Sequence, residues 1–329
     1  MKNFVIIANS ILLARSLIAA WPSPEELALY NARQHGAEAQ ERLRVVDSEG
    51  RPVAGARVWG GLQTGDELND YIEIKGLTNT NGEFVICGKC TNRIRCEITK
   101  EGYYDSEFVA ADYGYAHDLK DGKWQPYGKQ TKVVLKKIID PVVAGVRYIE
   151  QKIPSFGTWM GYDLEKVDWV SPFGRGDKSD VMVRFSARES GPFDFGYRME
   201  LSFTHFPFAG VLRCKKEPFT RFPYAYHADT NALYQGEIEF EVDRSGAKKV
   251  WKQLGEDEYL IFRTRTRIDS NGKLISAHYG RIDGEWKFYE LHTMQIGGVY
   301  FNGMSNDTNL EDEHSFKDAL RKIRRSSKR

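Results

Sequence analysis

The sequence has little of what known catalytic or cofactor sites require. Its 329 residues contain no Ser-His-Asp order, no glycine-rich phosphate loop and no paired zinc motif, and the seven histidines are scattered. We therefore expect no cofactor and no metal site. A non-catalytic protein is favoured over an enzyme.

Charge of one sign and long apolar segments are also scarce. The 47 Lys and Arg residues almost balance the 46 Asp and Glu residues, which gives a net charge of +1. Because no whole-chain field attracts the protein to polyanions, nucleic acid is not an expected partner. No segment is apolar over the roughly 20 residues that cross a bilayer, so no transmembrane span is expected.

The first residues have the order of a secretory signal peptide. Lys2 precedes an apolar run from Phe4 to Ala14, and small residues follow around Ala20. We predict a signal peptide over residues 1–20 and therefore a secreted, periplasmic or cell-surface protein.

Residues 21–42 are predicted to hold a leading helix. Ser23 can cap its start, and Pro24 suits the first helical turn. We expect the helix to run from Pro24 to about Arg42.

From residue 43 the apolar residues recur with a period of two, which predicts a series of β-strands. The segments VVDSEGRPVAGARVW, TNTNGEF and EITKEGYY follow one another in this region. Together they resemble the carboxypeptidase regulatory-like domain, and the resemblance implies a transthyretin-like β-sandwich over residues 43–137. It also implies a non-catalytic accessory module of exported and cell-envelope proteins, without peptidase activity. The family usually has an acidic residue before Gly-x-Phe, where this chain has Asn79 and Asn81, so no cation is expected there.

Three cysteines lie close together in this region. If residues 84–87 pair with residues 92–99 as a hairpin, Cys96 faces the core and Cys87 lies at the loop beside Cys90. Three interpretations remain open: structural thiols, a Cys87–Cys90 disulfide, or a metal or redox site. Structural thiols are favoured, because a zinc site has only the distant Cys214 as a further ligand.

Residues 138–151 are predicted to be a linker, and residues 152–312 a second, mainly β domain. The segments VMVRFSAR and YRMELSFTHF alternate apolar and polar residues, which predicts strands with one wet face. The segment SGAKKVWKQLG has helical spacing behind a Ser245 cap, and residues 259–291 predict a three-strand meander.

The second half also resembles segments of uncharacterised exported bacterial proteins, in GYDLEKVDWVSPFGRG, SAHYGRI and NDTNLE. This resemblance implies one unit but no activity. Residues 313–329 are predicted to form a basic C-terminal helix or tail. The expected fold is mainly β: a transthyretin-like β-sandwich, then a β-rich domain with a short helix, plus N- and C-terminal helices.

Two sets of side chains are candidate ligand-binding residues. Flat rings in loops can stack on sugar rings. The aromatic candidates are Tyr113, Tyr115, Trp124, Tyr127, Phe222, Tyr224 and Tyr226. The arginines Arg263, Arg265 and Arg267 alternate along one strand and could line one face as a ladder for an anionic polymer, or pair with the stripe of Glu237, Glu239 and Glu241.

These observations favour an exported, non-catalytic binding or structural module, with a polysaccharide or an envelope protein as partner. One alternative is a polysaccharide-acting hydrolase with acid and base carboxylates in the second domain. The other is an adhesion scaffold for proteins.

Overall fold

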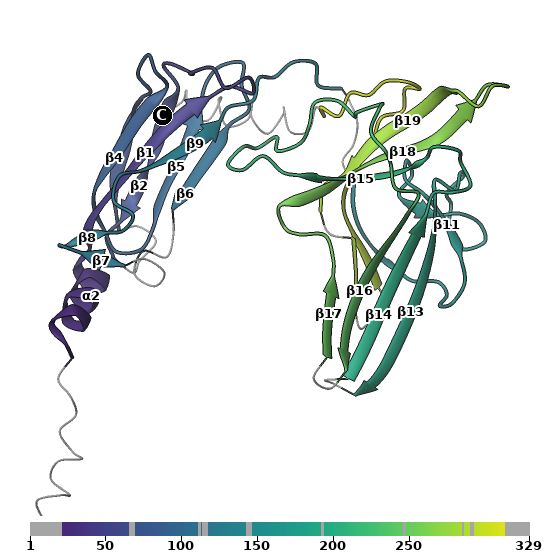
Figure 1. Ribbon diagram of the computed structural model, residues 1–329, viewed down its shortest axis with the longest axis horizontal. Coiled ribbons are helices and arrows are strands. Elements are labelled where there is room, and N and C mark those ends of the chain that lie inside the picture. Colours follow the sequence, from purple (N-terminus) through teal and green to yellow (C-terminus); the bar gives the residue numbers. More distant parts are fainter. Residues whose placement is uncertain are drawn as a thin grey trace, which may run out of the picture. The chain divides into compact units, whose positions relative to one another are not determined.

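The computed structural model describes residues 22–65, 70–110, 113, 118–142, 147–191, 194–245, 248–284, 286–289 and 293–312. Within them the chain is mainly β, as predicted, and it divides into two compact units (Figure 1). The first unit is Met1–Lys100 with Ser106–Leu135, and the second is Glu101–Asp105 with Lys136–Arg329. The predicted signal peptide and the predicted tail 313–329 lie outside the described residues. No described helix is long and apolar enough to cross a membrane.

The first unit contains a helix followed by short strands. Its elements are α2 (Pro24–His35), β1 (Ala37–Val46), β2 (Arg57–Gln63), β3 (Tyr71–Leu77), β4 (Glu83–Cys90), β5 (Ile94–Thr99), β6 (Ser106–Ala110), β7 (Leu119–Lys120), β8 (Lys123–Trp124) and β9 (Lys129–Val134). Strands β4, β1, β8 and β7 form sheet A, with β9 also paired to β1, and β3, β2, β5 and β6 form sheet B. The sheets pack as a β-sandwich, with Phe84 of β4 against Gly76 of β3 and Leu62 of β2 against Gly88 of β4.

The predicted leading helix begins where expected but is shorter. The Ser23 hydroxyl accepts a hydrogen bond from the Glu26 N–H, and the Glu26 carboxylate accepts one from the Ser23 N–H, which completes a capping box. The helix ends at Gly36, whose φ of 77° favours glycine. Residues 37–42 are a strand rather than helix, because pairing with β4 and β9 buries Ala37 and Ala39 and outweighs their helix propensity.

The cysteine-rich segment is not a hairpin. Strand β4 pairs with β1 in sheet A, whereas β5 pairs with β2 and β6 in sheet B, so the chain crosses between sheets after Cys90. Cys87 is exposed and Cys90 is buried, and all four cysteines are free thiols, so the Cys87–Cys90 disulfide is not formed. Cys96 is buried in the core, as predicted. Burial raises the pKa of Cys90 to about 11 and that of Cys96 to about 12, so both thiols stay protonated at neutral pH.

The second unit consists of two six-stranded sheets. Its strands are β10 (Arg147–Lys152), β11 (Met160–Asp163), β12 (Asp168–Trp169), β13 (Val181–Gly191), β14 (Asp194–Ser202), β15 (Gly210–Lys215), β16 (Glu237–Ser245), β17 (Lys248–Lys252), β18 (Glu258–Ile268), β19 (Leu274–Ile282), β20 (Trp286–Tyr289) and β21 (Thr293–Phe301). Sheet C has the order β10-β21-β19-β18-β15, with β20 also on β21, and sheet D has the order β12-β11-β13-β14-β16-β17.

The main core of this unit lies between sheets C and D. Phe185 and Met199 of sheet D belong to one buried cluster with Phe262 and Ile296 of sheet C, as the alternation along β13 and β14 predicts. A second cluster lies on the other face of sheet C, where residues 224–234 and Leu310 pack against β18 and β19. Sheet C is therefore covered on both faces.

Three sequence expectations for this unit need correction. The segment expected as a short helix is strand β17, which pairs with β16 so that Lys252 lies opposite Glu241, and this cross-strand pairing outweighs the helical spacing. The β18–β19 hairpin turns at residues 269–272 as predicted, but β20 pairs with β21 instead of β19. Strand β10 begins inside the expected linker 138–151.

Candidate functional site

The predicted arginine ladder on β18 is not an open stripe. The register shifts between Thr264 and Arg267, and Arg265 has a φ of 50°, so the three arginines do not share one face. Arg263 is buried, donates to the backbone oxygens of Phe208 at 2.7 Å and Thr230 at 3.1 Å, and lies over the Tyr234 ring. Of the three arginines only Arg267 is exposed, so they cannot bind successive charges of an anionic polymer.

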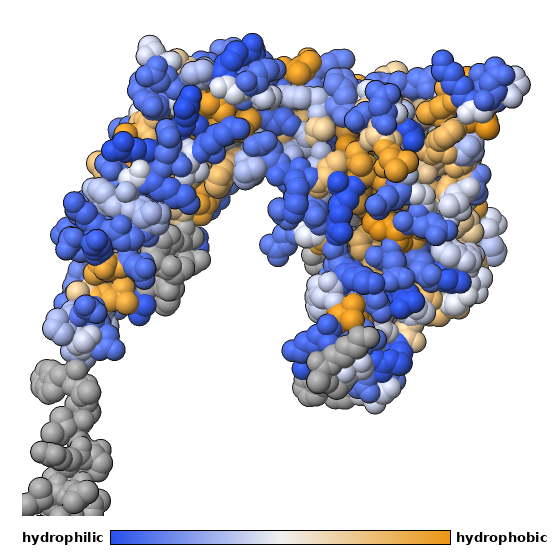
Figure 2. Space-filling model, in the orientation of Figure 1, coloured by the Kyte–Doolittle hydropathy of each residue, from blue (hydrophilic) through white to orange (hydrophobic). Residues whose placement is uncertain are grey.

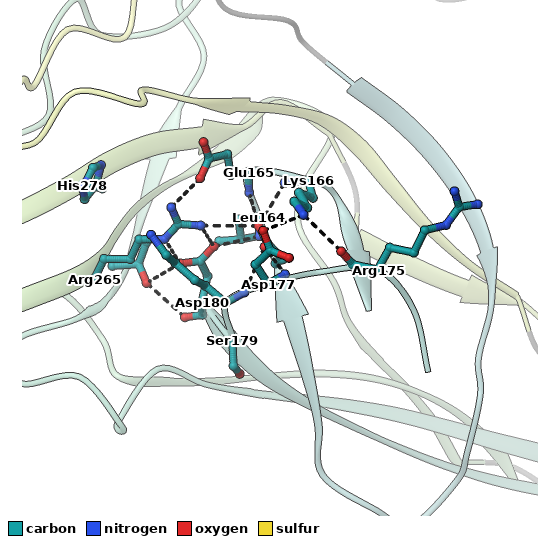
Figure 3. Close-up of polar contacts among 12 residues, drawn as sticks. Leu164, Glu165, Lys166, Arg175, Asp177, Ser179, Asp180, Arg265 and His278 are labelled. Carbon is teal, nitrogen blue, oxygen red and sulfur yellow. Dashed lines mark hydrogen bonds and ion pairs between the residues drawn. The ribbon is translucent and has the colours of Figure 1, made fainter. Parts of the chain in front are cut away.

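Arg265 is the centre of a buried ion-pair cluster, shown in Figure 3. Its Nε atom lies 2.7 Å from Oδ1 of Asp180, and its Nη2 atom lies 2.9 Å from Oδ2. Nη1 binds Glu165, and Nη2 lies 3.4 Å from Oδ1 of Asp163. Asp180 is fully buried and also accepts a hydrogen bond from the Leu164 N–H. The cluster therefore fastens the segment 163–180 to β18.

Asp163 stabilises the loops on either side of this cluster. Burial alone would raise its pKa, but backbone N–H groups of Lys166, Lys178 and Asp177 and the charge of Arg265 together lower the pKa. The carboxylate stays ionised at neutral pH, so its role is to hold loops rather than to donate a proton.

The glutamate stripe on β16 is paired within sheet D instead of with β18. Arg198 lies 3.1 Å from Glu241 and 3.8 Å from Glu239, and the Lys252 amine lies 3.5 Å from both carboxylates. Arg198, Lys252 and Glu239 are exposed and Glu241 is half-buried, so these pairs satisfy charge on a wet face and add little stability.

Some other buried or half-buried carboxylates in the described part of the second unit are also bound to arginine. Arg281 binds Asp283 and Asp312, and Arg184 binds Glu200 through two nitrogen atoms. A glycosidase needs one carboxyl group that can give up a proton. An arginine partner favours the ionised form, but at Asp180 and Asp283 burial outweighs the arginine and raises the pKa. No group of three or more His, Cys, Asp or Glu side chains among the described residues could hold a metal ion.

The expected aromatic platform in the first unit lies mostly inside the sandwich. Trp124 is fully buried and donates to the Cys90 carbonyl at 2.7 Å, and the buried Tyr113 donates to Glu41 at 2.7 Å. Tyr127 is half-buried beneath the Lys123 amine. Tyr115 lies outside the described residues.

The expected rings of the second unit surround two cations. The Lys136 Nζ atom lies 4.8 Å from the centre of the Phe222 ring and 4.6 Å from that of Tyr226, and it also donates to the Tyr224 carbonyl. The Arg281 guanidinium lies 4.2 Å from the Tyr224 ring. Phe222 is fully buried, and Tyr224 and Tyr226 are half-buried, so these rings contact cations of this unit instead of forming an open platform for a sugar.

Lys136 gives this cluster a specific pH dependence. Burial lowers the pKa of the amine from 10.5 to about 8. Between these values the unfolded chain holds a proton that the folded chain has lost, so this group makes the free energy of unfolding rise with pH. The rise approaches about 1.4 kcal/mol per pH unit.

We expect Lys136→Met to remove this rise. Urea unfolding at a series of pH values between 7 and 10.5 would measure it, with the exposed neighbour Lys137→Met as the matched control. The control should keep the wild-type slope above pH 8, whereas Lys136→Met should have a flatter profile. Parallel profiles for all three proteins would contradict the assignment.

An exposed aromatic face does occur, on sheet B of the first unit. The surface visible in Figure 2 is mainly hydrophilic, with hydrophobic residues in smaller patches. On the outer face of sheet B, Trp59 of β2 is 40% exposed and Tyr71 of β3 is 52% exposed. The two residues project from the same face, because Trp59 lies opposite Lys75 and Tyr71 lies opposite Gln63.

Both rings have defined positions. The Tyr71 ring lies on Gly61, where an added Cβ would come within 2.6 Å of its Cδ2 atom. The Tyr71 ring therefore lies against the glycine backbone, and about half of the residue remains exposed to solvent. The Trp59 Nε1–H donates to Oε1 of Glu73 at 3.1 Å. Since same-face residues on a strand are about 6.6 Å apart, the ring over Gly61 lies one step from Trp59.

Neither Trp59 nor Tyr71 is among the aromatic candidates predicted from the sequence, because those candidates lie in segments that were expected to be loops. The signal was present in the alternation: Trp59 follows Val58, a core residue of the strand, and must therefore face outward. The position of Tyr71 over Gly61 depends on the pairing of β2 with β3, which the sequence does not specify.

No protein-family model and no curated protein matches this chain. Among solved structures, 3-chlorocatechol 1,2-dioxygenase from Rhodococcus opacus is similar over 32% of this chain and 62% of its own, with 17% identity and a TM-score of 0.26. A DUF3823 family protein from Parabacteroides merdae matches 81% and 100% of the two chains, with 11% identity and a TM-score of 0.21. The major pilin subunit of Bacillus cereus matches 84% and 100%, with 12% identity and a TM-score of 0.22.

This chain spans less than two thirds of the length of the dioxygenase. The TM-scores of all three structures are too low to support a conclusion about fold or function. The β architecture of the chain itself is compatible with a non-catalytic binding or structural module.

Proposed function

We propose that this chain is an exported, non-catalytic module that binds polysaccharide through the outer face of sheet B. The observation that carries the proposal is the pair of exposed rings, Trp59 and Tyr71, held side by side on a sheet face. Aromatic rings with one open face suit the apolar faces of sugar rings, and neighbouring polar groups can bind the hydroxyls. Because the rings are held in place before binding, little side-chain entropy is lost on contact.

The proposal includes the carboxypeptidase regulatory-like identity of the first unit. Its support is local: the Asp47 carboxylate accepts backbone N–H bonds from Glu49 and Arg51 in the turn after β1. The side-chain oxygen of Asn79 likewise accepts hydrogen bonds from the backbone N–H groups of Asn81 and Glu83 in the turn before β4. These turns coincide with the segments that carry the resemblance.

Trp59→Ala is expected to weaken binding at least about 30-fold, because exposed tryptophans at binding sites contribute about 2 kcal/mol or more. Co-sedimentation with cell-wall sacculi and a panel of insoluble polysaccharides would measure this, with supernatants assayed for released sugar. Trp251→Ala is the matched control, since Trp251 is 73% exposed in the second unit.

The control protein should pellet like the wild type and neither should release sugar. If Trp59→Ala pelleted as well as the wild type, sheet B would not be the binding site. If sugar were released, the protein would be an enzyme rather than a non-catalytic binding module. Circular dichroism of each variant confirms that the fold is retained.

A further inference from the structure

The charges around the two rings narrow the class of ligand, provided that the proposed function holds. The cations on the outer face of sheet B are Arg57, Lys75 and Arg95, and the anions are Glu73, Glu97 and Glu107. These three positive and three negative side chains cancel, so the described strand residues of this face carry no net charge. A charged polymer would gain no net attraction from it.

The charges closest to the rings already have partners. The Glu73 carboxylate accepts from Trp59 through Oε1 and binds the Lys75 amine at 2.8 Å through Oε2. Arg95 binds Glu107 across the neighbouring strands. To bind these cations, an anionic sugar would have to replace the carboxylates that already pair with them. It would also lie close to those carboxylates and be repelled by their charge, so both effects oppose binding.

The rings themselves favour an extended chain lying flat. Gly61 lets the Tyr71 ring lie against the sheet, and Glu73 binds the indole N–H of Trp59. Because Trp59 and Gly61 are two residues apart on β2, their backbone positions on this face are about 6.6 Å apart. Each aromatic ring suits one sugar ring of a linear chain, and no charged group is needed for either contact.

We infer that the ligand is an uncharged, linear polysaccharide that stacks two of its sugar rings on Trp59 and Tyr71. Gly61 is a positioning residue in this arrangement, because any side chain there would lift the Tyr71 ring from the sheet. The backbone of Gly61 does not need a positive φ, so alanine acts through its Cβ, which would meet the Tyr71 ring and lie 3.2 Å from the Ile72 carbonyl oxygen.

Affinity electrophoresis of the full chain tests this inference. The gels contain uncharged polymers (hydroxyethylcellulose, xylan, mannan or starch) or anionic polymers (carboxymethylcellulose, alginate or polygalacturonate), and each is run at low and high salt. We expect at least one uncharged polymer to retard the protein equally at both salt concentrations. Trp59→Ala should weaken the binding that causes this retardation at least about 30-fold, and Gly61→Ala should weaken it in the same gels.

The outcomes separate the inference from the proposed function. Trp59-dependent retardation by an anionic polymer, lost at high salt, would overturn the uncharged class and leave a glycan-binding module. Full retardation of Gly61→Ala would overturn the flat placement of Tyr71. If no polymer retards the protein, both the inference and the proposed function fail.

Discussion

Replacing Arg281 with methionine is expected to lower the free energy of unfolding by about 3–5 kcal/mol, the usual cost of removing one partner of a buried ion pair. The Arg281 side chain is 1% exposed, and its Nε atom lies 2.7 Å from Asp283. It also binds Asp312 and the Leu310 carbonyl. Methionine would keep much of the volume but remove the guanidinium that binds the buried carboxyl groups of Asp283 and Asp312.

Urea unfolding followed by tryptophan fluorescence measures this loss. Arg213→Met is the matched control, because Arg213 lies in the same sheet, is exposed and binds Glu258 at 3.0 Å. The control should cost less than about 1 kcal/mol, as exposed pairs do. Equal losses in the two variants would show that Arg281 does not organise the second unit.

Replacing Arg265 with methionine is expected to cost a similar amount, about 3–5 kcal/mol, since Asp180 would remain fully buried without its two-point partner. The effect should also be local. Hydrogen exchange of residues 163–180 should become faster, because this segment loses its attachment to β18.

The matched control is Arg267→Met, two residues along the same strand and exposed. It should change stability by no more than about 0.5 kcal/mol and leave the exchange of residues 163–180 unchanged. If both variants had the same exchange profile, the cluster around Arg265 would not be what holds this segment.

The arginines on β18 show where sequence periodicity stops being informative. Alternation predicts that three residues two apart share a face, and it holds for the buried residues of β13 and β14. On β18 one residue with a positive φ shifts the register, and each arginine then has a different environment. The sequence does not indicate that a residue other than glycine, here Arg265, will have a positive φ.

The aromatic residues show a related limit. Rings in expected loops are the natural candidates for a sugar platform, but Trp124 lies in strand β8 and is buried, and Phe222 is buried because loops also need packed side chains. The exposed pair lies on strands, and only the neighbour relation of β2 and β3 brings Trp59 and Tyr71 together. Alternation gives the direction of one side chain, whereas a site also needs the pairing between strands.

The most direct test of the account is to observe the Trp59 indole N–H in an NMR titration with a soluble oligosaccharide of the polymer that binds. Trp59→Phe assigns the signal. The account predicts a saturable shift of the Trp59 signal, while the signals of the exposed Trp159 and Trp251 stay in place. A shift of Trp159 or Trp251 with Trp59 unchanged would contradict the placement of the binding site on sheet B.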